Sequence, residues 1–516
     1  MRYGFVIDQR RCIGCHACTV ACKEENRVPL GAFRTWVKYI ERGVFPNTRR
    51  YFSVLRCNHC DAAPCVTICP TVALYRRDDG IVDFDGSRCI GCKSCMQACP
   101  YDALYIDPDT MTAAKCNYCA HRIEVGLEPA CVIVCPERAI IAGDLDDPKS
   151  PIATIVGREP VQVRKAEQGT RPKVFYLGAD AAALTPELQA PSEGYLWAER
   201  PRDEVDLMKM VAAAQEPSSA AASPGLSRPV YDAPHAVRPW GWRVAAYLWT
   251  KSIAAGALLV AAFAGSDAWG DLFNAVAPAL SLLFLALTTV LLVADLKRPD
   301  RFAYILLKPN WRSWLVWGAW ILMAFGVVGA VWLVAGVTGR ANLVHLALLP
   351  SALLALATAG YSAFLFGQAE GRDFWQSPLV LPHLIVAALL AGAATLSIAA
   401  AVAPSRNAEA DPIQTLWPLL FLALVAHGFL VGLEVVNRHA VHDATLAARL
   451  IRRGPLRATF WGGVVLGGVV LPMALLIAGA ASDSVAVSTL GALLALVGLW
   501  LWEDLWVKAG QSVPLS

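Results

Sequence analysis

The 516-residue sequence contains 16 cysteines, but none of them follows Cys135. Its first residues, MRYGFVIDQRRC, lack both the apolar core of a signal peptide and a twin-arginine signal, so we expect no export signal in the cysteine-rich region. The net charge is only +3, which gives no indication of nucleic-acid binding. No glycine-rich nucleotide-binding loop is recognisable either. We therefore do not expect this chain alone to turn over a small substrate.

The cysteines that are present form four sets of four. Residues 11–23 read RCIGCHACTVACK and residues 88–100 read RCIGCKSCMQACP, so the spacing C-x2-C-x2-C-x3-C occurs twice. In chain order the sets are Cys12, Cys15, Cys18 and Cys22; Cys57, Cys60, Cys65 and Cys69; Cys89, Cys92, Cys95 and Cys99; and Cys116, Cys119, Cys131 and Cys135. The last three sets each end in a Cys-Pro pair.

This spacing indicates [4Fe–4S] clusters. Three closely spaced thiolates can bind three corners of one cube while the fourth cysteine reaches a second cube, so the motif works in pairs. We expect the fourth cysteine to lie at the start of a helix, with the following proline in its first turn. One alternative is zinc, which the tight three-cysteine runs fit poorly. Another is a disulfide framework, which requires an oxidising compartment.

The order of the sets predicts how they pair. The second and third sets are neighbours and resemble a bacterial ferredoxin, and the first and fourth sets form an outer pair around them. The region is then a duplicated ferredoxin unit with one copy inserted inside the other. The expected ligand groups are Cys57, Cys60 and Cys65 with Cys99; Cys89, Cys92 and Cys95 with Cys69; Cys12, Cys15 and Cys18 with Cys135; and Cys116, Cys119 and Cys131 with Cys22.

Residues 6–26 (VIDQRRCIGCHACTVACKEEN), 56–74 (RCNHCDAAPCVTICPTVAL), 115–136 (KCNYCAHRIEVGLEPACVIVCP) and 171–178 (RPKVFYLG) carry a family resemblance. Together they resemble the four-cluster electron-transfer subunits of molybdopterin oxidoreductases. That family serves enzymes acting on dimethyl sulfoxide, polysulfide, thiosulfate, tetrathionate, nitrate, formate and sulfite. Because all 16 cysteines are present, the resemblance implies four [4Fe–4S] clusters and a catalytic partner subunit that contains molybdopterin.

Beyond residue 240 the sequence consists largely of long apolar runs. Eight segments have about 20 residues or more, enough for a helix to cross a hydrocarbon layer of about 30 Å. Their approximate bounds are 243–265, 272–294, 313–337, 343–367, 379–402, 414–436, 458–480 and 485–507. We therefore expect an α+β ferredoxin-like iron–sulfur domain over residues 1–195, a linker or surface strap over 196–239, and an all-α bundle of eight transmembrane helices over 240–516.

Three stretches of this second half also show a resemblance. They are YLWTKSIAAGALL (247–259), ADLKRPDRFAYILL (294–307) with WLVWGAWIL (314–322), and GYSAFLFGQAEGRDFWQSPLVLPHL (360–384). They are similar to the NrfD/polysulfide-reductase membrane subunit, which implies quinone exchange near the cluster-bearing face and no haem. The two halves are usually separate chains and are fused here.

Basic residues predict the orientation in the membrane. Loops on the side of the cluster domain, with the tail, contain Lys297, Arg298, Arg301, Lys308, Arg312, Arg372, Arg438, Arg449, Arg452, Arg453, Arg457 and Lys508, whereas far-side loops contain only Arg340 and Arg406. The positive-inside rule therefore predicts a bacterial inner-membrane protein whose cluster domain faces the cytoplasm. One alternative is that these arginines dock the cluster domain, and another is that the domain faces the periplasm, as the resemblance implies for many relatives.

Ionisable groups within membrane spans are candidates for a quinone site. The resemblance implies that Tyr361 is the fourth-helix tyrosine that touches the quinone in polysulfide reductases. In the first helix Tyr247 and Lys251 stand where the polysulfide enzyme uses a histidine. The structural alternatives are an interfacial aromatic for Tyr361 and a snorkelling or hydrogen-bonded lysine for Lys251.

Asp295 and Glu434, at the ends of the second and sixth spans, are further candidates. His345, His383 and His427 lie singly on different predicted helices, and we interpret them as core or interface histidines. Without a facing pair of histidines we expect no haem.

Together these features predict an electron-transfer and membrane-anchor subunit that exchanges electrons with menaquinone or ubiquinone. Its molybdopterin-containing partner would act on a sulfur compound such as sulfite, polysulfide or thiosulfate, or on formate. Three alternatives remain at this stage: the quinone-coupling subunit of a [NiFe] hydrogenase, a passive anchor, and an ion-translocating module.

Overall fold

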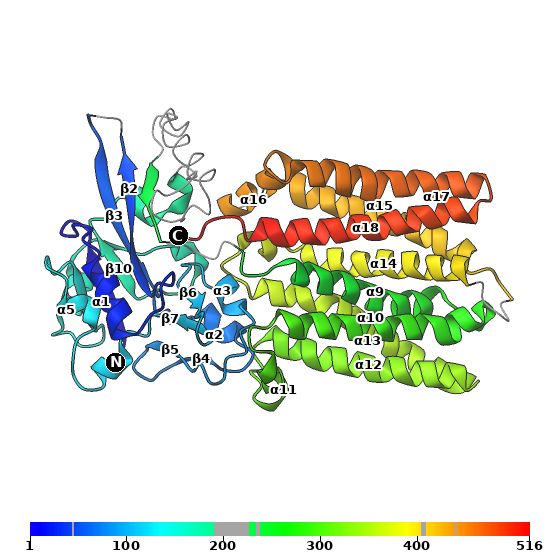
Figure 1. The fold of residues 1–516 in the computed structure, drawn as a ribbon, viewed down its shortest axis with the longest axis horizontal. Coiled ribbons are helices and arrows are strands. Elements are labelled where there is room, and N and C mark those ends of the chain that lie inside the picture. The colour runs from blue at the N-terminus through cyan, green and yellow to red at the C-terminus, as the bar shows by residue number, and fades with distance from the viewer. Residues whose placement is uncertain (44–45, 190–226, 234–237, 404–408, 438, 440) are drawn as a thin grey trace. The chain divides into compact units, whose positions relative to one another are not determined.

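The computed structural model describes residues 1–43, 46–189, 227–233, 238–403, 409–437, 439 and 441–516. These residues form two compact units (Figure 1). Unit 1 comprises Met1–Val237 and Pro514–Ser516, and unit 2 comprises Arg238–Val513.

The centre of unit 1 is a four-stranded sheet in the order β8–β1–β10–β9. Its strands are β1 (Tyr3–Asp8), β8 (Ile140–Asp144), β9 (Val161–Gln162) and β10 (Val174–Leu177). β1 pairs in parallel with β10 and antiparallel with β8, so the first strand of the chain is an interior strand. Phe5, Val6 and Ile7 are at most 1% exposed, which is the burial expected of an apolar run in an interior strand.

A second sheet has the order β11–β2–β3. β2 (Thr35–Arg42) and β3 (Arg49–Arg56) form a long hairpin, and β11 (Arg228–Tyr231) pairs with the other edge of β2. β11 lies within the segment interpreted as a linker, so part of that segment is a strand of unit 1. Residues 196–226 and 234–237 of the same segment lie outside the described residues.

Five of the 16 cysteines of unit 1 lie in short helices, and the other eleven lie in the loops beside these helices or at their ends. The helices are α1 (Ala17–Glu25), α2 (Pro64–Ile68), α3 (Ser94–Ala98), α4 (Ala120–Ile123) and α5 (Ala130–Ile133); α6 (Pro151–Arg158) and α7 (Ala181–Leu184) follow. The hairpin β4 (Leu74–Arg76)–β5 (Val82–Phe84) follows α2, and the hairpin β6 (Leu104–Ile106)–β7 (Ala113–Lys115) follows α3. α2 packs against α3 and α1 packs against α5, which is the inner and outer pairing expected of nested units.

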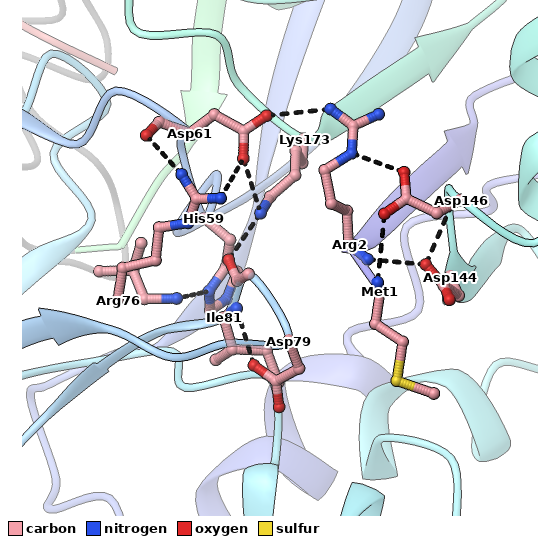
Figure 2. A network of polar contacts seen from close by, with 12 residues as sticks. Met1, Arg2, His59, Asp61, Arg76, Asp79, Ile81, Asp144, Asp146 and Lys173 are labelled. Carbon is pink, nitrogen blue, oxygen red and sulfur yellow. Dashed lines mark hydrogen bonds and ion pairs between the residues drawn. The ribbon is translucent and has the colours of Figure 1, made fainter.

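A polar network joins separate segments of unit 1 (Figure 2). Asp61, which follows Cys60, accepts a hydrogen bond of 3.1 Å from Arg2 and lies 3.2 Å from the buried Lys173 ammonium. Arg2 also donates to Asp146 at 2.8 Å. Because Arg2 precedes β1 and Lys173 precedes β10, the network fixes the cysteine loop before Asp61 to the central sheet.

The described residues of unit 2 contain eight long helices, which confirms the eight predicted spans to within a few residues. Their bounds are α9 (Trp242–Ala264), Leu272–Val276 with α10 (Ala277–Asp295), α12 (Trp314–Val337), α13 (Ala341–Gly367), α14 (Val380–Val402), α15 (Ile413–Val436), Thr459–Val470 with α17 (Leu471–Ala481), and α18 (Val485–Gly510). The segments Leu272–Val276 and Thr459–Val470 are π-helical, and α11 (Tyr304–Leu307) and α16 (His442–Arg452) are short connecting helices. Figure 1 shows the long helices running side by side.

α9 is the central helix of the bundle. In its most apolar stretch of 18 residues 94% of the residues are buried, whereas the figure for the span that contains α10 is 28%. α9 packs closely against α14 through small residues. A Cβ atom on Gly256 would lie only 1.9 Å from the carbonyl oxygen of Ala388, and Gly392 faces Gly256 in the same way. Small residues are what allow such a close helix approach in a membrane.

We expect Gly256→Leu to destabilise unit 2 by about 3 kcal/mol or more, because the new side chain overlaps the α14 backbone. Thermal unfolding of the detergent-solubilised protein would measure the loss. Gly432→Leu is the matched control, because a Cβ atom there meets no neighbouring atom within 4 Å. Equal stability of the two variants would contradict this account of the α9–α14 contact.

Candidate functional site

Three cavities in unit 1 are each lined by four cysteines. The three groups are Cys69, Cys89, Cys92 and Cys95; Cys22, Cys116, Cys119 and Cys131; and Cys12, Cys15, Cys18 and Cys135. A fourth group gathers around Cys65, whose sulfur interacts electrostatically with those of Cys57, Cys60 and Cys99. Every group thus joins three cysteines of one set to the fourth cysteine of its paired set.

Left-handed backbone turns curl each cysteine loop around its cavity. Gly14 and Gly91, which stand between the first two cysteines of their sets, have φ angles of +71° and +68°. The N–H groups of Gly91 and His59 each donate to the sulfur of the cysteine two residues earlier, at 3.4 Å. These backbone dipoles favour negative charge on the sulfurs. Gly14 has a second constraint, because a Cβ atom there would lie 2.4 Å from the Phe52 ring.

The expectation that the fourth cysteine begins a helix is wrong for the Cys-Pro pairs of the inner sets. Cys69 and Cys99 follow the last residues of α2 and α3 and have extended backbones, with ψ angles of 115° and 117°. The physical reason is that a residue before proline is pushed out of the helical region. Pro70 and Pro100 therefore end the helix that carries the third cysteine and leave the fourth thiol at its C-terminal end.

The donor set of these cavities fits [4Fe–4S] clusters better than the alternatives. All 16 cysteines are free thiols, so the structure contains no disulfide framework. Among the described residues, no three Cys, His, Asp or Glu side chains approach closely enough to hold a single metal ion such as zinc. Burial raises the pKa of Cys18 to about 11 and that of Cys99 to about 12. Such thiols keep their protons unless a metal centre stabilises the thiolate.

The four cysteine groups are neighbours in series. Cys18 of one group interacts electrostatically with Cys131 of the next. Cys116 of that second group interacts with Cys57, and Cys95 of the last group interacts with Cys65. The outer groups therefore adjoin the inner ones, as a path for single electrons requires.

Arg56, the last residue of β3, lies beside the cysteine group that contains Cys18 and the next group, which contains Cys131. Its guanidinium is 1% exposed and donates a hydrogen bond of 3.2 Å to the sulfur of Cys131. Burial alone would lower its pKa, but the nearby sulfurs of Cys131, Cys116 and Cys18 outweigh burial and raise it. Arg56 is therefore a fixed positive charge between two cysteine groups.

We expect Arg56→Gln to lower the reduction potential of the adjacent centres by on the order of 50 mV, because the lost charge favours the reduced, more negative state. A potentiometric titration followed by electron paramagnetic resonance would measure the shift. Arg42→Gln is the control, since Arg42 is 53% exposed and pairs with Asp180. Unchanged potentials in Arg56→Gln would contradict the role given to this charge.

In unit 2, three of the five predicted quinone-site residues lie together. Lys251, which is 0% exposed, donates hydrogen bonds to the Ala359 carbonyl at 2.9 Å and to the Ser362 hydroxyl at 2.8 Å. Its ammonium also lies 5.0 Å from the centre of the Tyr361 ring, a cation–π contact. Tyr247, one helical turn before Lys251, interacts with both Tyr361 and Ser362.

The neighbouring helix α12 makes room for the Tyr361 ring. A Cβ atom on Gly318 would lie 2.4 Å from that ring, so the glycine in WLVWGAWIL allows the tyrosine to be buried between helices. Tyr361 is only 4% exposed, which makes it an interior residue of the bundle and not an interfacial aromatic. Asp295, at the end of α10, is half-buried and interacts with Tyr247.

Glu434 occupies a different place, and here the sequence analysis missed a cluster. The Glu434 carboxylate accepts a hydrogen bond of 2.6 Å from Trp506 Nε1 and lies 3.3 Å from His383 Nδ1. His383 Nε2 lies 3.2 Å from His427 Nδ1, so these two histidines are partners, contrary to the expectation that they are single. His345 is separate and pairs with Asp267 at 3.0 Å. Glu503 was not a candidate at all, although it is buried beside Lys251.

Comparison with known proteins agrees with this architecture. Residues 232–514 match the family described as polysulphide reductase, NrfD. Residues 48–145 match a 4Fe-4S dicluster domain, and residues 10–25 match a 4Fe-4S binding domain. The fold and the cysteine cavities thus define an iron–sulfur protein that is joined in one polypeptide to a multi-pass membrane domain. The protein belongs to the polysulphide reductase NrfD family, which confirms the predicted resemblance.

The cluster domain also has relatives among characterised proteins. A tetrathionate reductase subunit of Salmonella typhimurium is 50% identical over 202 residues, which cover 38% of this chain and 80% of the relative. A polysulfide reductase chain of Wolinella succinogenes is 42% identical over 181 residues, 34% of this chain and 94% of the relative. The thiosulfate reductase electron transfer subunit PhsB of Salmonella typhi is 47% identical over 163 residues, 31% of this chain and 84% of the relative.

Proposed function

We propose that this chain is the electron-transfer and membrane subunit of a respiratory oxidoreductase complex and connects a catalytic partner to the quinone pool. The observation that carries the proposal is the series of four cysteine groups, in a chain whose membrane unit buries Lys251 against Tyr361. The 16 cysteines would hold four [4Fe–4S] clusters, which supply one-electron transfer. The backbone N–H groups and Arg56 would stabilise the sulfur charge around them.

The quinone would bind where Tyr247, Lys251 and Tyr361 meet. A lysine ammonium has three N–H donors, and Lys251 uses two of them on Ala359 and Ser362. The third can donate to a quinone oxygen, while the two tyrosine hydroxyls can donate or accept at the same head group. Asp295 is close enough to Tyr247 to influence it.

The names of the relatives suggest the class of partner. They belong to reductases of tetrathionate, polysulfide and thiosulfate. We propose a molybdopterin-containing catalytic subunit that acts on a sulfur compound or on formate, with the cluster domain on the cytoplasmic side of a bacterial inner membrane. The basic loop residues described above support this orientation.

Purification of the complex from its native membranes tests the proposal. We expect about 16 iron atoms per chain, a copurifying subunit that contains molybdenum or tungsten, and reduction of the clusters by an added quinol. A copurifying nickel protein would instead favour the hydrogenase alternative. A zinc-loaded, colourless cluster domain would contradict the electron-transfer role.

A further inference from the structure

Glu503 of α18 is a buried carboxylate that the cluster and quinone sites leave unexplained. It is 3% exposed, and neither of its carboxylate oxygens has a hydrogen-bond partner among the described residues. An ionised carboxylate in the interior of a membrane bundle is costly unless it is paired or takes up a proton. The Glu503 carboxylate therefore needs either a positively charged neighbour or a proton.

Glu503 lines a small cavity to which three helices contribute ionisable side chains. His383 from α14 and Glu434 from α15 face the same cavity. His383 connects Glu434 to His427, as described above, and His427 Nε2 has no hydrogen-bond partner in the part of the chain that the structure describes. The cavity is therefore bordered by groups that can hold and pass protons.

Glu503 also faces the proposed quinone site. Its carboxylate interacts electrostatically with the Lys251 ammonium and lies close to the Ser252 hydroxyl, which likewise lacks a hydrogen-bond partner within the described residues. The titratable groups that face Glu503 are Lys251 and Tyr247 from α9, His383 from α14 and Glu434 from α15. Glu503 thus adjoins both Lys251 and the cavity that His383 lines.

We propose that Glu503 carries protons between the quinone head group at Lys251 and the cavity lined by His383 and Glu434. The inference rests on the proposed quinone function. Oxidation of a quinol to a quinone releases two electrons and two protons. The electrons would leave one at a time through the iron–sulfur domain. The Glu503 carboxylate accepts the two protons one after the other from the two quinol O–H groups, becomes a carboxylic acid each time and passes each proton on to His383 or Glu434 at the cavity. Reduction of a quinone reverses each of these steps.

The test compares Glu503→Gln, Glu503→Asp and the control Asp504→Asn in the complete complex in membranes. Asp504 is the next residue of α18 but pairs with Lys508 at 2.5 Å. For Glu503→Gln we expect kcat with a soluble quinol to fall at least about tenfold, because a positioned acid–base group contributes that much or more. KM should change less than about twofold, and the pH profile of kcat should flatten. Glu503→Asp should restore most of the rate, and Asp504→Asn should behave as the wild type.

Dithionite reduction of the clusters, followed by electron paramagnetic resonance, shows that each variant is assembled. If quinol reduces the wild-type clusters but Glu503→Gln keeps the wild-type rate and pH profile, the proton role is wrong and the quinone site stands. A fall in rate with an unchanged pH profile, or an equal fall in Asp504→Asn, also overturns the inference. If quinol does not reduce the wild-type clusters, the proposed function fails and the inference with it.

Discussion

Replacing Cys99 with alanine is expected to remove one cluster and to abolish electron transfer between the catalytic partner and quinone. Cys99 meets Cys57, Cys60 and Cys65 in one of the inner groups, and the groups lie in series. The loss of one member therefore interrupts the whole path. The iron content should fall from about 16 to about 12 atoms per chain, and one paramagnetic signal of the reduced protein should disappear.

The control for this experiment is Met96→Leu, a volume-conserving change in α3, the helix that Cys99 terminates. It should leave the iron content and the electron transfer unchanged. An unchanged iron content in Cys99→Ala would show that Cys99 is not a ligand. A loss of about eight iron atoms would show that the clusters of the inner pair depend on one another for assembly.

Removing the buried charge by Lys251→Met is expected to slow quinol-linked reduction of the clusters about 100-fold, equivalent to about 2.7 kcal/mol of transition-state stabilisation. Lys251 is the buried cation beside Tyr361, and methionine removes the donor to the quinone oxygen while it keeps much of the volume. Tyr361→Phe should cause a smaller loss, because it removes one hydroxyl and keeps the ring. Stopped-flow absorbance with a soluble quinol would measure both rates.

The sequence offers a matched control for these two variants. Lys308 lies 4.9 Å from the centre of the Tyr304 ring, a distance similar to that between Lys251 and Tyr361. Lys308 is exposed, however, and directly follows α11, the helix that begins at Tyr304. Lys308→Met and Tyr304→Phe should leave the rate unchanged. If Lys251→Met also keeps the wild-type rate, Lys251 takes no part in the reaction with quinol, and this result would favour a membrane unit that is only an anchor. Reduction of the clusters by dithionite should be normal in all four variants.

The cysteine groups and the membrane spans could be predicted from the sequence because both depend on local patterns. Ligand spacing such as that of RCIGCKSCMQACP is a geometric requirement of the cluster, and a span needs only a minimum length of apolar helix. The Cys-Pro pairs were misplaced for a local reason as well. Proline is compatible with a first helical turn, but its stronger effect is on the residue before it, which leaves the helix.

The remainder of the membrane site depends on which helices are neighbours. His383 and His427 lie on α14 and α15, and nothing in the apolar runs between them shows that their rings meet at 3.2 Å. Glu503 occurs in the stretch LWEDLW near the end of a span, where an acid is expected to reach water. Only the packing of α18 shows that Glu503 is buried. Its neighbour Asp504 forms a local i,i+4 pair with Lys508.

The nested order of the cysteine sets has a consequence for biosynthesis. The inner groups possess all their thiols once Cys99 has been synthesised, whereas the outer groups wait for Cys131 and Cys135. Iron delivered while the polypeptide is still emerging from the ribosome would therefore find the inner pair complete first. Maturation would proceed from the inside outward, and a nascent polypeptide that stalls between residues 99 and 131 would leave two half-built sites exposed to oxidation.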